Sequence, residues 1–197
     1  MAERVENRIT SYFEESVAAN VDFARKNWKD IFNAAKAIAS ALKKGNKLLL
    51  FGNGGSAADA QHIAAEFVNR FQMERKPLPA ISLTTDTSVL TSISNDYDFK
   101  EIFSKQIMAI GKKGDIAVGI TTSGNSPNVL SGLRQARRMR MTTIGILGKD
   151  GGAAKKECRI PLIVECGRTS IVQEVHITLL HAICIIVDEI LFGNRKQ

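Results

Sequence analysis

Five short apolar runs, separated by helical patterns, constrain the fold of this 197-residue chain more than any other feature. Each run is continuously apolar rather than alternating, which is typical of strands that are covered on both faces of a sheet. Strands that alternate with helices along a chain form parallel sheets with crossover helices. The sequence therefore predicts a doubly wound α/β fold with a five-stranded parallel sheet, whose strands are expected at 47–51, 80–83, 115–120, 142–147 and 159–164.

A long helix is predicted before the first strand, because residues 3–44 contain no glycine or proline and show helical apolar periodicity. The apolar residues form two stripes, one through Val5 and Phe13 and a later one through Trp28 and Ile38. Two stripes exceed what one helix needs for packing against its own domain. We therefore expect an oligomerisation segment at 1–44 and one α/β domain at 45–197, closed by a helix over about 170–191.

The composition of the chain indicates its partners, its location and the state of its cysteines. The net charge of +7 comes from short, scattered basic groups without an RNA-binding motif, so nucleic acid is not the expected partner. A positive field would instead help to gather a phosphorylated small molecule. The first twenty residues have no continuous apolar stretch, and no eighteen apolar residues run together, so a cytoplasmic location is predicted. The three cysteines lack CxxC spacing and are expected to be reduced thiols.

Two polar loops are expected at the carboxyl edge of the sheet, where ligands bind in folds of this class. The first, "GNGGSA" at 52–57, follows a strand and opens a helix, with Ser56 as the expected N-cap. The second, "TTSGNSPN" at 121–128, offers hydroxyl groups, an amide and a glycine before Pro127, a favoured first helical residue. Two such loops at one edge predict an anion cradle, although ordinary turns with N-caps would show the same residues.

A dinucleotide site is the main rival for the first loop, because Gly52-x-Gly54-x-x-Ala57 matches the relaxed Rossmann fingerprint. That site requires an acidic residue at the end of the second strand to hold a ribose. Glu74 lies before that strand and Asp86 lies too far beyond it. The dinucleotide reading is therefore set aside.

Polar side chains that can bind a metal or transfer a proton are expected in pairs on two of the helices. His62 and Glu66 are four residues apart and share a helical face. On the last helix Gln173 and His181 are eight residues apart and also share a face, whereas His176 points about 60° away from Gln173. The surrounding residues are apolar, so both pairs are expected to be buried and to need partners. The two pairs could supply each other or share a metal.

At this point five motifs show a resemblance to a known family. The motifs "FGNGGSAADAQHIAAEF", "LTTDTSVLTSISND", "GITTSGNSPNVL", "LGKDGG" and "VQEVHITLLH" resemble, in order and spacing, the sugar isomerase (SIS) domain proteins of the phosphoheptose isomerase type. The resemblance covers nearly the whole chain and implies a flavodoxin-like SIS fold. It also implies an enzyme that interconverts sedoheptulose 7-phosphate and D-glycero-D-manno-heptose 7-phosphate, the first step of heptose precursor synthesis for lipopolysaccharide or surface glycans. A cytoplasmic homotetramer with active sites at subunit interfaces is implied as well.

The resemblance also assigns roles to individual residues. It implies one zinc ion per subunit, held by His62, Glu66, Gln173 and His181. The implied substrate contacts are Asn53, Gly54, Gly55, Asn95, Asp96, Thr121, Thr122, Ser123, Ser126 and Gln173. Two departures from the family pattern stand out. The second loop has Thr121 where serine is usual, and Ile171 stands where many relatives have an arginine.

Aldose–ketose isomerisation requires a base and an acid at neighbouring carbons. Glu66 is interpreted as the base at the substrate carbon and His181 as the acid–base group near the oxygens, while zinc would polarise the carbonyl. The order of proton abstraction stays open. An alternative within the same fold is a non-catalytic protein that binds the replication initiator and regulates DNA replication. Relatives of that type lack the glutamate and the last histidine, which this sequence retains as Glu66 and His181. A regulatory module that only senses phosphosugars would need the loops but no acid–base pair.

Overall fold

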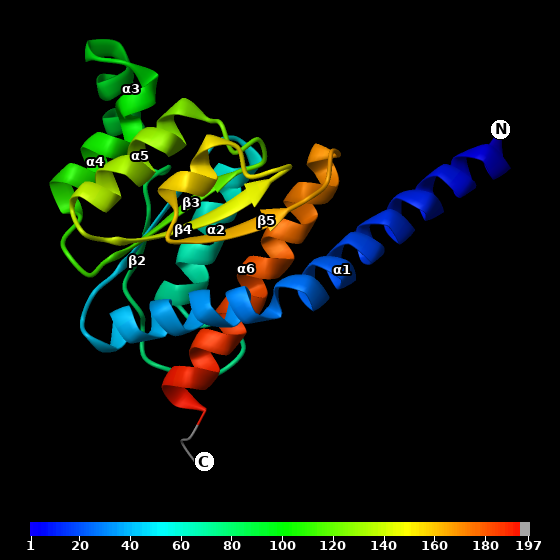
Figure 1. Cartoon of the computed structure of the whole chain (residues 1–197), viewed down its shortest axis with the longest axis horizontal. Coiled ribbons are helices and arrows are strands. Elements are labelled where there is room, and N and C mark those ends of the chain that lie inside the picture. The colour runs from blue at the N-terminus through cyan, green and yellow to red at the C-terminus, as the bar shows by residue number, and fades with distance from the viewer. Residues whose placement is uncertain (194–197) are drawn as a thin grey trace.

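The computed structural model describes residues 1–193, and its centre is a fully parallel five-stranded sheet in the order β2-β1-β3-β4-β5 (Figure 1). The predicted α/β class and strand positions are confirmed, with bounds that differ by one or two residues. The strands are β1 (Leu48–Gly52), β2 (Ala80–Ser82), β3 (Ile116–Thr121), β4 (Thr142–Gly148) and β5 (Ile160–Val164).

Six α-helices and two short 3₁₀ turns connect the strands. The predicted first and last helices are present, each within one residue of the expected bounds. The helices are α1 (Ala2–Lys43), α2 (Gly55–Val68), α3 (Thr87–Asp96), α4 (Ile102–Ile110), α5 (Pro127–Arg138) and α6 (Thr169–Phe192), and the turns are η1 (Phe99–Glu101) and η2 (Ala153–Glu157).

Helices cover both faces of the sheet, which explains why the strands are continuously apolar. Along β1, Leu48 and Leu50 pack with α1, α2 and α6, whereas Leu49 and Phe51 pack with α4 and α5. All five residues of β1 are buried as a result. The alternation of side chains along a strand thus supplies two separate apolar cores, one on each face.

Helix α6 lies inside the molecule, between α1 and α2 and against the sheet (Figure 1). It is long and apolar enough, by length and composition alone, to cross a membrane, although the sequence predicted no spanning segment. Half of its most apolar stretch is buried within the fold, a pattern that core helices share with membrane spans. Packing against α1, α2 and the sheet accounts for the buried half of this stretch.

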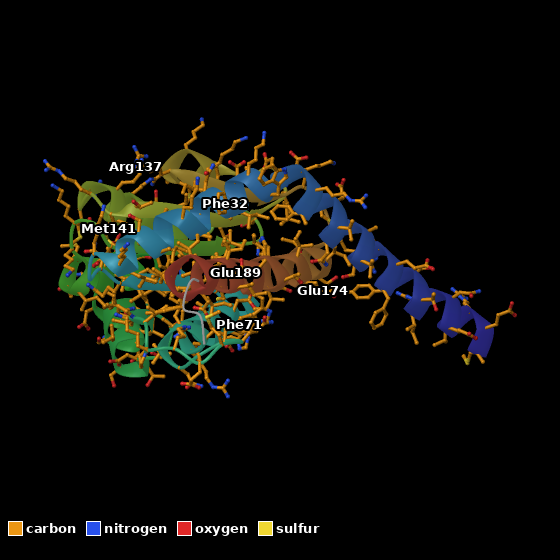
Figure 2. The ribbon with its side chains drawn as sticks, turned by 90° about the horizontal axis from the view of Figure 1, so that it is seen from below. Phe32, Phe71, Arg137, Met141, Glu174 and Glu189 are labelled. Atoms are coloured by element: carbon orange, nitrogen blue, oxygen red, sulfur yellow. The ribbon has the colours of Figure 1, made fainter. Side chains whose placement is uncertain are left out.

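The two halves of α1 have different environments. From Phe23 onward the helix contributes buried residues to the core, whereas its first half extends away from the rest of the protein (Figure 1). Glu174 of α6 accepts hydrogen bonds from Tyr12 and Ser16 where α1 leaves that body (Figure 2). The first predicted stripe is exposed, and its exposed large side chains include Val5, Ile9, Phe13, Val17 and Val21.

A buried ion pair fixes the start of the sheet. Asp115 is fully buried and accepts a hydrogen bond from the ammonium group of Lys47 at 2.6 Å. The backbone N–H groups of Lys47 and Lys112 donate to the same carboxylate at 3.1 and 2.9 Å. These contacts join the chain before β1 to the chain before β3, at the amino edge of the sheet.

Candidate functional site

The loops after β1 and β3 lie side by side where the strand order reverses, because the chain leaves β1 for β2 while β3 pairs with the other side of β1. The amide groups of Asn53 and Asn128 join the two loops, each donating to the other's oxygen at 2.8 Å. Asn128 is buried, and sequence reasoning missed its role. No sequence signal pairs two amides that lie 75 residues apart.

The first loop turns sharply at Gly54, whose φ of 55° and ψ of −122° suit glycine alone. Gly54 is the N-cap residue of α2, so Ser56 is a buried residue of the first turn and its predicted N-cap role is wrong. At Gly55 an added Cβ atom would lie 2.5 Å from the amide nitrogen of Gln173, so a larger residue there would displace the end of that side chain. The side chain of Gln173 therefore sits directly over the start of α2.

Three hydroxyl groups converge in the second loop. The oxygen of Thr121 lies 2.9 Å from that of Ser126 and 3.4 Å from that of Ser123. Helix α5 begins at Pro127, as predicted. Pro127 has no N–H group, and Val129 and Leu130 donate to the Asn128 side chain and the Ser126 carbonyl, which leaves, among the described residues, the N–H group of Asn128 as the free main-chain donor in the first turn. The loop is supported from behind by the chain after β4, since Ala154 donates to the carbonyl of Gly124 at 2.9 Å. Hydroxyls and a helix N-terminus together form an anion-binding environment.

Helices α2 and α6 bring together His62, Glu66 and His181. The Nε2 atoms of His62 and His181 are 2.8 Å apart, and the His62 Nε2 lies 3.6 Å from the Glu66 carboxylate. The ring of Phe71 stacks on His181, with centroids 5.2 Å apart and planes inclined by 10°. Sequence spacing placed these groups on the correct helix faces, and His62 lies between the two groups interpreted as base and acid.

The predicted burial of these pairs is only partly correct. The His62 side chain is 48% exposed and that of Glu66 is 20% exposed. The apolar neighbours of His62 in the sequence face the core on the other side of α2, so the helix leaves this edge open. Partial burial and the charge of His62 lower the pKa of His181, while the Glu66 carboxylate opposes that change.

Asp59 belongs beside this cluster and was missed by sequence reasoning. Among residues 1–193, one oxygen of its carboxyl group is buried and has no hydrogen-bond partner. Burial raises the pKa of Asp59, and the nearby His62 opposes that rise. The i,i+3 spacing of Asp59 and His62 places them on one face of α2, and that spacing is the signal that could have found it.

His62, Glu66 and His181 are side chains of the types that bind zinc. Among residues 1–193 no three His, Cys, Asp or Glu side chains are arranged as ready ligands. The two Nε2 atoms, 2.8 Å apart, are closer than the roughly 3.3 Å that separates two nitrogens on one tetrahedral zinc. Outward movement of the half-exposed His62 ring would widen the distance between the two Nε2 atoms to the value that zinc requires. Two imidazoles and a carboxylate suit zinc chemically, so the residues fit such an ion.

The structure separates the other candidate residues from this cluster. Gln173 lies about two turns before His181 on α6, beside Gly55 rather than beside the histidines. Asn95 and Asp96 are exposed and hydrogen-bonded to each other at 2.9 Å, on a helix that has no buried residue. Asp86 caps that helix by accepting from the N–H of Val89 at 2.9 Å, a structural role unlike that of a ribose ligand.

Two further residues of α6 belong to the core. His176 is fully buried against the main chain of Leu147, and burial lowers its pKa to about 4, so the ring is neutral near pH 7. It takes no part in the cluster of His62 and His181. Ile171 is also fully buried, so its side chain serves packing.

Comparisons with known proteins identify the family and the fold. The family model described as "SIS domain" matches residues 11–148. A phosphoheptose isomerase of Nitratidesulfovibrio vulgaris is 50% identical over 194 residues, covering 98% of this chain and 93% of that protein. One of Aquifex aeolicus is 51% identical and covers 92% of this chain and 95% of that protein. A solved phosphoheptose isomerase from Francisella tularensis superposes with a TM-score of 0.90 at 40% identity, covering 94% and 98% of the two chains.

Proposed function

The chain belongs to the SIS domain family, and we propose that it interconverts sedoheptulose 7-phosphate and D-glycero-D-manno-heptose 7-phosphate in heptose metabolism. It is an isomerase, as full-length relatives of about 50% identity are named phosphoheptose isomerases. The substrate class is inferred from the distance between the two polar loops and the cluster of His62, Glu66 and His181. His62 lies seven residues beyond Gly55, about 10 Å along α2. That separation suits a sugar whose phosphate and reacting carbons lie at opposite ends.

The phosphate end of the substrate binds at the two loops. Backbone N–H groups at the starts of α2 and α5 and the converging hydroxyls of Thr121, Ser123 and Ser126 supply the donors. The full set of proposed substrate contacts is Asn53, Gly54, Gly55, Asn95, Asp96, Thr121, Thr122, Ser123, Ser126 and Gln173.

The reacting carbons lie at the cluster on α2 and α6. Glu66 removes the proton from one carbon to give an enediol and returns a proton to the neighbouring carbon, while His181 moves a proton between the two oxygens. The lowered pKa of His181 keeps its ring neutral near pH 7, a state in which one nitrogen accepts a proton while the other donates one. His62, Glu66 and His181 are the residues that would hold zinc, which when bound would polarise a carbonyl oxygen. Gln173, the fourth ligand expected from the sequence, lies beside Gly55 and away from this cluster.

Replacement of Ser123 or Ser126 by alanine tests the phosphate cradle. Each variant should raise KM with little change in kcat, because a phosphate remote from the reacting carbons is bound equally in the ground and transition states. Steady-state kinetics with sedoheptulose 7-phosphate would measure both constants. Unchanged KM in both variants would exclude phosphate binding by this loop.

We further propose a cytoplasmic homotetramer with active sites at subunit interfaces. Two surfaces support this assembly: the exposed apolar stripe of α1, and helix α3 with its exposed Asn95 and Asp96. The large side chains Tyr97 and Phe99 beside α3 are also more than half exposed. A second copy of the chain would cover these groups and bring α3 to a site.

Light scattering of the purified protein at micromolar concentration tests this assembly. A mass of four chains of 21.5 kDa is expected. Phe13→Glu places a charge in the exposed stripe of α1 and should shift the mass downward, whereas Lys113→Glu, at an exposed position before β3, should not. A monodisperse monomer of the unaltered chain would contradict the assembly.

Incubation of the purified protein with sedoheptulose 7-phosphate tests the function itself. NMR should show a new heptose 7-phosphate that grows to an equilibrium mixture, and the product alone should give the same mixture. The absence of any conversion would overturn the proposal. The alternative of a non-catalytic replication regulator finds no support, since the relatives reported are phosphoheptose isomerases and both Glu66 and His181 are present.

A further inference from the structure

A buried arginine closes the loop that follows α2. Arg75 is 8% exposed, and its Nη2 and Nη1 atoms donate to the carbonyls of Glu66 and Phe67, each at 2.8 Å. These carbonyls belong to the last turn of α2, where no intrahelical N–H group is available to them. A cation at the carboxyl end of a helix is also favoured by the helix dipole. Arg75 therefore caps the helix that carries Glu66, through the main chain of Glu66 itself.

The same guanidinium group reaches across to α6. Its Nε atom donates to the carboxylate of Asp188 at 2.8 Å, and the two side chains are only 2% and 5% exposed. Asp188 lies seven residues after His181, close to two helical turns, so both side chains are on the same face of α6. Arg75 thus joins α2 to α6 about two turns away from the contact between His62 and His181.

The closed loop also places an aromatic ring on His181. Arg75 donates to the carbonyl of Asn69 at 3.2 Å, so both ends of the segment 69–75 are held together. Phe71, labelled in Figure 2, lies within this segment. Its ring stacks on that of His181. The orientation of that ring consequently depends on a loop whose ends are fixed by one guanidinium group.

We propose that Arg75, paired with Asp188, is a positioning residue that sets the spacing of Glu66 and His181 and holds Phe71 against the His181 ring. The inference rests on the proposed function, because Glu66 and His181 are its acid–base groups. Arginine suits this task and lysine does not, since a planar fork can donate to several carbonyls and a carboxylate at once. The Arg75 side chain caps α2, pairs with Asp188 of α6 and closes the segment 69–75. Its replacement should therefore slow proton transfer at the reacting carbons and leave phosphate binding unchanged.

Kinetics of Arg75→Lys test the proposal. Lysine keeps the charge next to Asp188 but cannot reach the carbonyls and the carboxylate together, so the protein should fold with kcat lowered about 10-fold to 100-fold by misplacement of the acid–base groups. KM should stay within about twofold, because the phosphate loops are untouched. Asp188→Asn provides a second variant, with a smaller loss of kcat in the same direction.

Lys47→Gln is the matched control, because it breaks the other buried ion pair, that of Lys47 and Asp115, far from α2 and α6. It should lower the melting temperature while the folded protein keeps its kcat. If Arg75→Lys keeps a normal kcat, or if Lys47→Gln loses as much kcat as Arg75→Lys does, Arg75 acts only on stability and the proposal is overturned.

A spectroscopic measurement separates this inference from the proposed function. The chain has three histidines, so the ring protons of His181 can be assigned by comparison with His181→Gln. Stacking on Phe71 should shift these protons upfield, and Phe71→Leu should remove that shift. Arg75→Lys should move the resonances toward the Phe71→Leu position, even if the unaltered chain were inactive on sedoheptulose 7-phosphate. Unchanged His181 resonances would overturn the positioning role while leaving the isomerase proposal intact.

Discussion

Replacement of Glu66 by glutamine should lower kcat for sedoheptulose 7-phosphate by about 10²-fold to 10⁴-fold, the usual contribution of a positioned acid or base. Glutamine keeps the size of the side chain and an oxygen atom, so the fold and the packing of α2 should persist. The carbonyl of Glu66 would still accept its hydrogen bond from Arg75, since that contact involves only the main chain. Steady-state kinetics and a melting curve of the same preparation would measure the two effects.

Binding of the sugar phosphate should survive in Glu66→Gln, because the phosphate loops lie at the other end of the site. Isothermal titration with sedoheptulose 7-phosphate measures that affinity directly. Lys149→Gln is a suitable control, because it removes an exposed charge on the chain after β4 without touching the cluster. Near-normal turnover in Glu66→Gln would exclude Glu66 as the base.

Replacement of His62 by alanine should have the second large effect, and its cause should be different. His62 is assigned to the metal and not to proton transfer, so its loss should lower activity in step with zinc content. A direct ligand should cost more than the 10-fold to 100-fold that groups behind the ligands typically cost. Added zinc should restore part of the activity by mass action. Metal analysis and kinetics over a range of zinc concentrations would follow both quantities.

The position of His62 makes this experiment decisive for the assignment of roles. Its Nε2 atom contacts both the Glu66 carboxylate and the His181 ring. If His62→Ala is inactive even in saturating zinc while Glu66→Gln turns over normally, His62 is the better candidate for the base. Glu66 would then only orient the His62 ring.

The helical and strand elements could be predicted from the sequence because they depend on near neighbours. The continuous apolar run of β1 indicated a strand covered on both faces, and Pro127 marked the first residue of α5. Helical spacing placed His62 and Glu66 on one face, and the i,i+4 contact between them is present. Local rules failed at Ser56, because the main chain of Gly54 already begins the helix in a conformation that only glycine adopts readily.

The sequence by itself determined the strands, the helices, the two polar loops and the faces on which the ionisable residues lie, because backbone preferences and periodicity act over a few residues. Only the tertiary structure decided which of those faces meet. The contact of His62 with His181 spans 119 residues and that of Arg75 with Asp188 spans 113, so no local pattern encodes either one. The half-exposed state of His62 and the buried, unpaired oxygen of Asp59 were likewise decided by packing, since burial depends on how helices dock together rather than on the polarity of adjacent residues.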